Sequence, residues 1–123
     1  MSVFKGTKSV IELTPSDFDK NGKIIHPALD NKKGLVCMTC SWCHYCKELK
    51  KPYSETSNVL GSSFPMFNLD CVKYSEFSNK LGITSYPTIK YIDRSGKLYK
   101  NFTGERSVQG FFDDICKEAQ KCA

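Results

Sequence analysis

The sequence lacks any long apolar run. Among its 123 residues, no stretch approaches the roughly 20 apolar residues that a membrane-spanning helix requires. The first twenty residues hold no apolar segment of the kind found in a secretory signal peptide. We therefore expect a soluble, intracellular protein with no membrane partner. A chain processed from a precursor would look the same, so an oxidising compartment is not excluded.

The sequence also lacks a concentrated block of positive charge. It has 18 lysines and arginines against 13 acidic residues, a formal net charge of +5, but the lysines are spread along the chain. A protein that follows nucleic-acid phosphates needs clustered basic residues, so we expect no nucleic-acid partner. There is no internal repeat and no low-complexity segment. Length and composition fit a single domain over residues 1–123, with residues 1–9 as a flexible N-terminus.

Cysteine, by contrast, is abundant. The odd count of seven rules out complete pairing within one chain. Four cysteines follow one another at intervals of three residues and three are scattered, the two sets being Cys37, Cys40, Cys43 and Cys46, and Cys71, Cys116 and Cys122. Without a secretion signal, such a cluster is more often catalytic or metal-binding than part of a disulfide scaffold.

The order of apolar and turn residues predicts alternating strands and helices. We expect strands over residues 10–13, 34–39, 64–70, 88–93 and 97–102, and helices beginning at Thr14, from 43 to about 60, from 74 to 81, and after Ser107. Pro52 predicts a kink or a break in the second helix. This order indicates an α/β fold, with a central mixed sheet flanked by helices on both faces and a C-terminal β-hairpin plus helix.

The segment Trp42-Cys43-His44-Tyr45-Cys46 lies where the buried strand meets the long helix. A sulfur in the first helical turn faces free backbone N–H groups and the positive end of the helix dipole, which favour its thiolate. Cys46 lies one turn deeper, where it can attack a mixed disulfide formed by Cys43. The spacing predicts an attacking and a resolving thiol, joined in a redox-active Cys43–Cys46 disulfide, with no other cofactor.

The same segment resembles the active site of the thioredoxin family. Residues 82–91 (GITSYPTIKY) resemble the matching stretch of protein disulfide isomerase catalytic domains, and residues 10–14 and 69–71 resemble two of their strands. The resemblance covers roughly residues 10–120. It implies a thioredoxin fold and a thiol–disulfide oxidoreductase that acts on protein thiols and disulfides, with an unidentified electron donor or acceptor.

The resemblance also implies roles for residues around the two cysteines. Pro87 is expected to be a cis-proline facing the pair, which leaves the backbone of Tyr86 free to bind an extended substrate. Trp42 would shield one side of the sulfur. Arg106 falls near an arginine that lowers the pKa of the resolving cysteine, here Cys46.

Several positions depart from the family pattern. Cys37 stands where the family buries an acid that moves a proton to and from the resolving thiol, and Asn68 replaces the lysine that often pairs with that acid. His44 and Tyr45 fill slots that hold glycine and histidine in the isomerases. A protonated His44 would stabilise the thiolate of Cys43 and make the disulfide more oxidising.

Two other functions stay open. The run of four cysteines could form a zinc or iron–sulfur site, although three residues of strand advance about 10 Å and spread the sulfurs too far for one ion. The missing acid also leaves open a redox-inactive binding module with the same fold.

The cysteines outside the pair have simpler expected roles. We expect Cys40 to be buried and Cys37, Cys71 and Cys116 to lie in the core, since free cysteine is among the most buried residue types. Cys122 is expected to be exposed and able to form an intermolecular disulfide.

Overall fold

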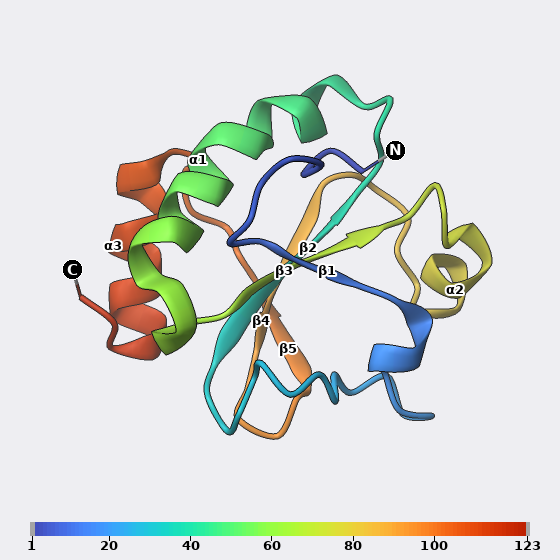
Figure 1. The fold of residues 1–123 in the computed structure, drawn as a ribbon, viewed down its shortest axis with the longest axis horizontal. Coiled ribbons are helices and arrows are strands. Elements are labelled where there is room, and N and C mark those ends of the chain that lie inside the picture. The colour runs from blue at the N-terminus through green and yellow to red at the C-terminus, as the bar shows by residue number, and fades with distance from the viewer. Residues whose placement is uncertain (1, 123) are drawn as a thin grey trace.

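A five-stranded mixed sheet forms the centre of the computed structural model, which describes residues 2–122. The strands lie in the order β1-β3-β2-β4-β5 (Figure 1) and comprise β1 (Ile11–Leu13), β2 (Gly34–Thr39), β3 (Met66–Asp70), β4 (Thr88–Ile92) and β5 (Leu98–Asn101). The strands β1 and β2, on either side of β3, run parallel to it, whereas β4 is antiparallel to both β2 and β5. The predicted mixed sheet and C-terminal hairpin are confirmed.

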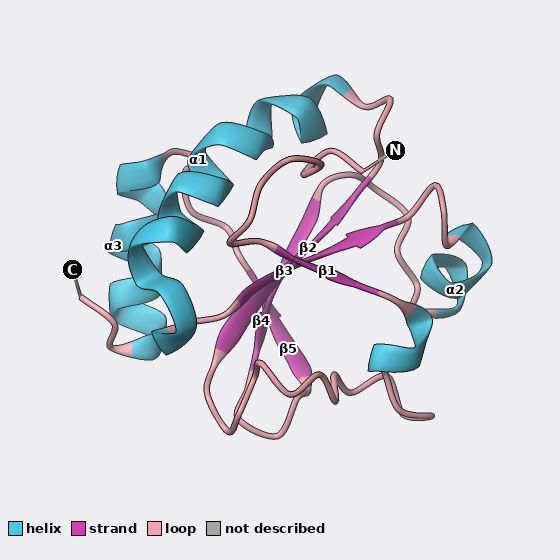
Figure 2. Ribbon diagram, in the orientation of Figure 1, coloured by secondary structure: helices cyan, strands magenta, loops and turns pink. Residues whose placement is uncertain are grey.

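Helices cover both faces of this sheet. The long helix α1 (His44–Leu60) and the C-terminal helix α3 (Val108–Ala119) pack together on one face, and α2 (Ser75–Lys80) lies on the other (Figure 2). Two short 3₁₀ turns, Pro15–Asp17 and Gly61–Ser63, complete the regular structure. The predicted three-layer arrangement is therefore confirmed.

The central strand β2 is buried along its whole length. Because successive side chains alternate, Leu35 and Cys37 join the core beneath α1 and α3, while Val36 and Met38 join the core on the α2 side. This is the reason for its uninterrupted apolar run, and it fixes the carboxyl end of β2 in the middle of the molecule.

Helix α1 runs through Pro52 without the break that the sequence suggested. Leu49 and Tyr53, on either side of the proline, are buried against the sheet. The Tyr53 hydroxyl lies within hydrogen-bond distance of the carbonyl oxygens of Leu35 and Phe67, at 3.2 and 2.7 Å. Packing and these contacts hold both halves of the helix against β2 and β3, and the predicted kink at Pro52 stays a prediction.

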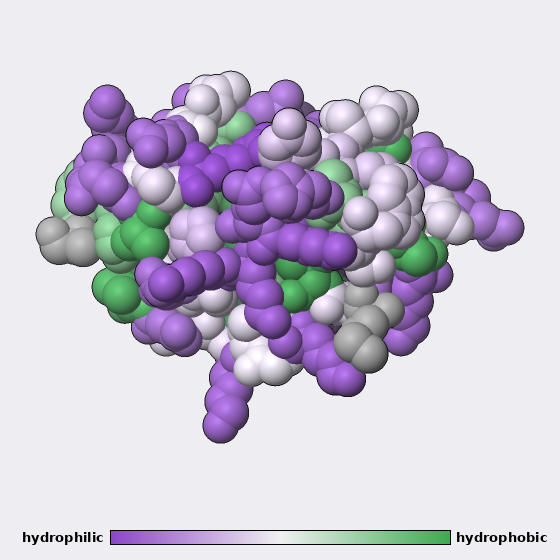
Figure 3. Space-filling model, turned by 90° about the horizontal axis from the view of Figure 1, so that it is seen from above, coloured by the Kyte–Doolittle hydropathy of each residue, from purple (hydrophilic) through white to green (hydrophobic). Residues whose placement is uncertain are grey.

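The exposed side of α1 is hydrophilic, because Lys47, Lys50 and Lys51 are all exposed. Figure 3 looks down on this side of the molecule and shows mostly hydrophilic residues with small, separate apolar areas. Over residues 2–122, none of the helices combines the length and the apolarity that crossing a membrane would need.

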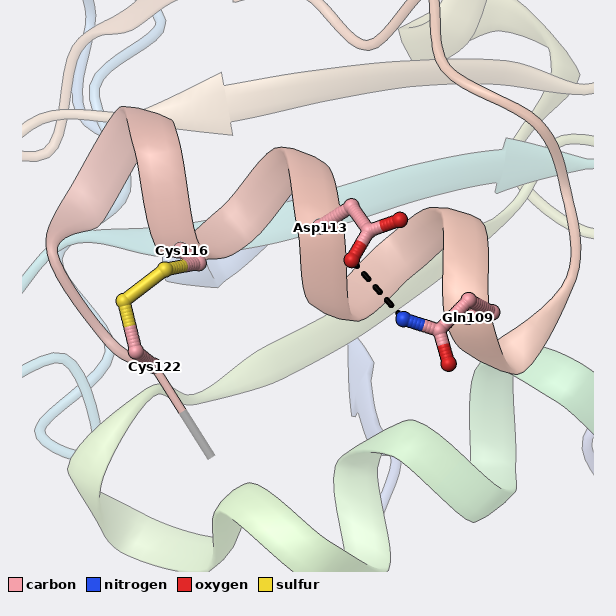
Figure 4. Close-up of a disulfide and its surroundings, with 4 residues drawn as sticks. All are labelled: Gln109, Asp113, Cys116 and Cys122. Carbon is pink, nitrogen blue, oxygen red and sulfur yellow. Dashed lines mark hydrogen bonds between the residues drawn. A yellow bond between two sulfur atoms is a disulfide. The ribbon is translucent and has the colours of Figure 1, made fainter.

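Both ends of the chain make contacts that the sequence did not indicate. Within residues 1–9, whose flexibility stays a prediction, Phe4 is buried, with its ring centroid 5.3 Å from that of Tyr53. At the other end, Cys116 is bonded to Cys122, so it is not a core thiol and Cys122 is not available to another chain. Gln120 adopts a left-handed conformation that turns the chain back beside α3 (Figure 4).

Helix α3 begins as predicted at Ser107, whose hydroxyl accepts a hydrogen bond from the Gly110 N–H at 3.0 Å. We expect Ser107→Ala to lower the free energy of unfolding by about 1 kcal/mol, because a helical N–H loses its partner. Urea unfolding measures this, with Ser62→Ala at an exposed turn as the control. Equal midpoints for the two variants would contradict the assigned cap.

Candidate active site

The site is built where β2 ends and α1 begins. Cys43 is the N-cap residue of α1 and is half-buried, and its backbone N–H donates to the Cys40 carbonyl oxygen at 3.1 Å. Cys46 lies in the first turn of the helix and is fully buried. The strand–helix junction predicted for the motif is therefore present, with one sulfur near solvent and the other behind it.

The environment of Cys43 lowers its pKa. The largest cause is the backbone N–H of Cys46, which points at the Cys43 sulfur from the first turn of the helix, and partial desolvation opposes it. Hydrogen bonding by the Cys46 thiol and the Tyr45 N–H, and the positive charge of Arg106, lower the pKa further. The thiolate of Cys43 is thus stabilised by the unpaired N–H groups that every helix start presents.

Cys46 has the opposite environment. Burial raises its pKa to about 12, although the Cys40 N–H, whose nitrogen is 3.3 Å from the Cys46 sulfur, works in the other direction. A thiolate on Cys43 raises it further. The pKa values of the two sulfurs of one motif are therefore shifted in opposite directions. The positive charge of Arg106 acts on Cys43, and its expected effect on Cys46 stays a prediction.

The loop before β4 closes the site from the opposite side. The Tyr86–Pro87 peptide bond is cis and Pro87 is buried. The Cys43 sulfur lies 3.7 Å from the Tyr86 carbonyl oxygen, to which the thiol donates. The Tyr86 backbone is therefore in contact with Cys43, and its role in substrate binding stays a prediction.

Large side chains on the helix start are open to solvent. Trp42 and Tyr45 expose 73 and 65 % of their surface. The His44 imidazole is also exposed and pairs with Glu48, with 2.6 Å between Nε2 and Oε1. The His44 imidazole therefore interacts with the Glu48 carboxylate. The Cys43 thiolate is stabilised mainly by backbone N–H groups and not by His44.

Cys37 does not replace the missing acid. Burial raises the pKa of its thiol well above the ordinary value, so it keeps its proton. Its sulfur lies 3.3 Å from the Asn68 Oδ1, which also accepts from the Thr39 hydroxyl at 2.7 Å. The Asn68 Nδ2 in turn donates to Glu12 Oε1 at 2.8 Å.

Sequence reasoning missed Glu12 as part of this network. In the sheet, Glu12, Asn68 and Cys37 stand directly side by side across β1, β3 and β2. In the sequence, the only indication of this role is that a charged residue lies inside a predicted strand. Its importance depends on the strand order, which brings the carboxylate to the edge of the polar row.

The run of four cysteines does not form one cage. Within the part of the chain that the structure describes, no group of three or more His, Cys, Asp or Glu side chains is placed to hold a metal ion. Cys37 and Cys40 are both buried, as expected, and Cys37 lies in the core beneath α1 and α3.

Comparison with known families identifies this arrangement. The thioredoxin family model matches residues 9–117. The chain belongs to the thioredoxin family. Protein disulfide-isomerase A3 of Gallus gallus is 30 % identical over 121 residues, covering 97 % of this chain and 22 % of that protein. Protein disulfide isomerase-like 2-2 of Oryza sativa subsp. japonica is 32 % identical over 106 residues, covering 84 and 27 % respectively.

Solved structures confirm the thioredoxin fold. The J-Trx1 fragment of ERdj5 aligns with a TM-score of 0.75 at 16 % identity, covering 97 % of this chain and 56 % of that fragment. The zinc-bound form of human ERp44 aligns with a TM-score of 0.72 at 23 % identity, covering 88 and 31 %. This thioredoxin chain thus spans only about a quarter of the length of the curated relatives above.

The contribution of Arg106 can be measured. We expect Arg106→Gln to raise the pKa of Cys43 towards its ordinary value, because a nearby positive charge that favours the thiolate is lost. The pH dependence of Cys43 alkylation by iodoacetamide reports this shift. Arg94→Gln, which removes an exposed arginine from the turn between β4 and β5, is the control and should leave the midpoint in place. An unchanged midpoint in Arg106→Gln would exclude the interaction.

Proposed function

We propose that this domain is a thiol–disulfide oxidoreductase that acts on protein thiols and disulfides through Cys43 and Cys46. One observation carries the proposal: the two thiols of one motif have opposite environments. The pKa of Cys43 is lowered by helical N–H groups, and that of Cys46 is raised by burial to about 12. In such a pair, one sulfur is the attacking thiolate and the other stays a protonated thiol until it resolves the mixed disulfide.

The reaction proceeds in two exchanges. The Cys43 thiolate attacks one sulfur of a substrate disulfide, forms a mixed disulfide and releases the other substrate sulfur as a thiolate. Cys46 then loses its proton and attacks the Cys43 sulfur, which releases the second substrate thiolate and leaves a Cys43–Cys46 disulfide. Two electrons pass from the domain to the substrate, and the reverse sequence oxidises a substrate dithiol.

Substrate recognition uses the surfaces around Cys43. The Tyr86 backbone beside the sulfur can pair with an extended substrate segment, as in strand addition to a sheet edge. The exposed rings of Trp42 and Tyr45 offer apolar area to the same segment. The requirement that a disulfide reach a half-buried sulfur favours substrates with exposed, flexible disulfides.

The second exchange is expected to be the slower one. Cys46 must lose a proton although its pKa is raised, and the network behind it contains Cys37 and Asn68 in place of a buried acid and its lysine. The nearest carboxylate of this network, Glu12, reaches only Asn68 directly. Proton removal from Cys46 therefore depends on water or on the departing thiolate.

Oxidising surroundings suit this chain. A disulfide such as Cys116–Cys122 persists in oxidising compartments, where thiols are not kept reduced. One similar curated protein is named endoplasmic reticulum resident protein 44, with 27 % identity over 115 residues. We propose a compartment of this redox character, with an electron partner that is a thiol or disulfide carrier.

Insulin reduction tests the assignment. Cys43→Ser should lower the rate to that of the reductant alone, because the attacking sulfur is lost. Cys46→Ser should accumulate mixed disulfides between Cys43 and insulin chains, because nothing resolves them. Non-reducing electrophoresis and mass spectrometry detect these adducts.

A double variant, Cys116→Ser with Cys122→Ser, is the control, since it removes a distant disulfide and should keep the wild-type rate. Equal activity in the wild type and both active-site variants would defeat the proposal. An inactive wild type that still binds unfolded protein would favour the redox-inactive module instead.

A further inference from the structure

Two buried thiols beside the active site have no part in the mechanism above. Cys40 follows the last residue of β2 and is 1 % exposed, and Cys71 follows the last residue of β3 and is 5 % exposed. Both are free thiols in this structure. They lie at the carboxyl ends of neighbouring parallel strands, the same edge of the sheet that carries Cys43.

The register of the two strands places these cysteines opposite each other. The last pair in the register is Thr39 with Asp70, and the Cys71 N–H donates to the Thr39 carbonyl oxygen at 2.9 Å, which extends the parallel ladder by one step. Continuing this register by one residue beyond both strands puts Cys40 opposite Cys71. Neighbouring strands lie about 4.8 Å apart, inside the range of about 4.4–6.8 Å between Cα atoms that a disulfide requires.

Their side chains also share one face of the sheet. By the alternation along β2, Cys40 points to the same side as Val36 and Met38, and Cys71 packs in the cluster that contains those two residues. A charge on Cys40 raises the pKa of both Cys71 and Cys46, which places Cys40 within electrostatic range of both. Cys37, by contrast, joins the opposite core cluster.

The active-site disulfide is the oxidant within reach of this pair. Sulfurs this deeply buried cannot meet the disulfide of a protein substrate. The Cys40 backbone nitrogen, however, lies 3.3 Å from the Cys46 sulfur, so the chain carrying Cys40 touches the resolving thiol directly.

We propose that Cys40 and Cys71 form a second dithiol–disulfide couple that exchanges with the active-site disulfide through Cys46. This inference rests on the function proposed above. The Cys40 thiolate attacks Cys46 in the Cys43–Cys46 disulfide and releases the Cys43 thiolate. The Cys71 thiolate then attacks Cys40 in the Cys40–Cys46 disulfide and releases the Cys46 thiolate, which takes up a proton. Two electrons pass from the buried pair to the active site, and the number of disulfides is unchanged.

A domain with both dithiol pairs can donate twice as many electrons as Cys43 and Cys46 alone. Once the disulfide has moved inward, Cys43 and Cys46 are dithiols again and can reduce a second substrate disulfide. The inward transfer is slow at neutral pH, because burial raises the pKa of Cys71 to about 11 and only a thiolate attacks. It accelerates as the pH rises towards that value.

Peptide mapping tests the linkage. The full chain is reduced, freed of reductant, oxidised with glutathione disulfide, blocked and digested with trypsin without reduction. Residues 51–73 contain Cys71 as their only cysteine, and residues 34–47 contain the four cysteines of the run. We expect a linked pair of these peptides in the wild type, its loss in Cys40→Ala, and its retention in the matched control Cys37→Ala.

Electron counting provides a second measurement that does not depend on one variant. In the Cys116→Ser, Cys122→Ser background, pre-reduced protein should reduce two equivalents of glutathione disulfide, and Cys71→Ala should reduce one. Circular dichroism confirms that each variant is folded.

Absence of the linked peptide in the wild type, or its persistence in Cys40→Ala, would overturn the inference. If insulin reduction still depends on Cys43 in that case, the proposed function stands without the second couple. If insulin reduction fails as well, both proposals fall. A link in the wild type that does not form in Cys46→Ser supports the route through the resolving cysteine.

Discussion

The site depends on unpaired backbone N–H groups at the start of α1, held at the end of a fully buried strand. Strand β2 is covered on both faces, and Leu49 and Tyr53 bind α1 to the sheet across Pro52. Because both elements are fixed, Cys43 sits at the N-cap and faces N–H groups that no carbonyl oxygen satisfies. A looser junction would let water compete for those groups and would remove the difference between the two sulfurs.

The polar groups behind the cysteines distinguish this site from the usual pattern of the thioredoxin family. Across β1, β3 and β2, Glu12, Asn68 and Cys37 form a hydrogen-bonded row in which the carboxylate is at the edge of the sheet. A neutral amide and a protonated thiol therefore occupy the centre of this row. The Cys40 N–H is the group that contacts the resolving sulfur, which ties the chemistry of the pair to the end of β2.

Local patterns were sufficient for much of this structure. The strand over residues 34–39, the cap at Ser107 and the position of the motif follow from apolar periodicity and capping residues, which act over a few positions. Contacts that need the strand order could not be predicted: Asn68 reaches Glu12, and the Cys71 N–H reaches the Thr39 carbonyl oxygen, only because β3 lies between β1 and β2. The Cys116–Cys122 bond depends on a left-handed turn at Gln120 that no pattern indicated.

The most direct test of the account is the titration of the reduced protein, followed by the ultraviolet absorbance of the thiolate. We expect one thiolate that appears below the ordinary cysteine pKa and disappears in Cys43→Ser, while Cys46 titrates only near a pKa of about 12. A titration with no step below the ordinary value, or one that persists in Cys43→Ser, would contradict the claim that the helix start stabilises this sulfur.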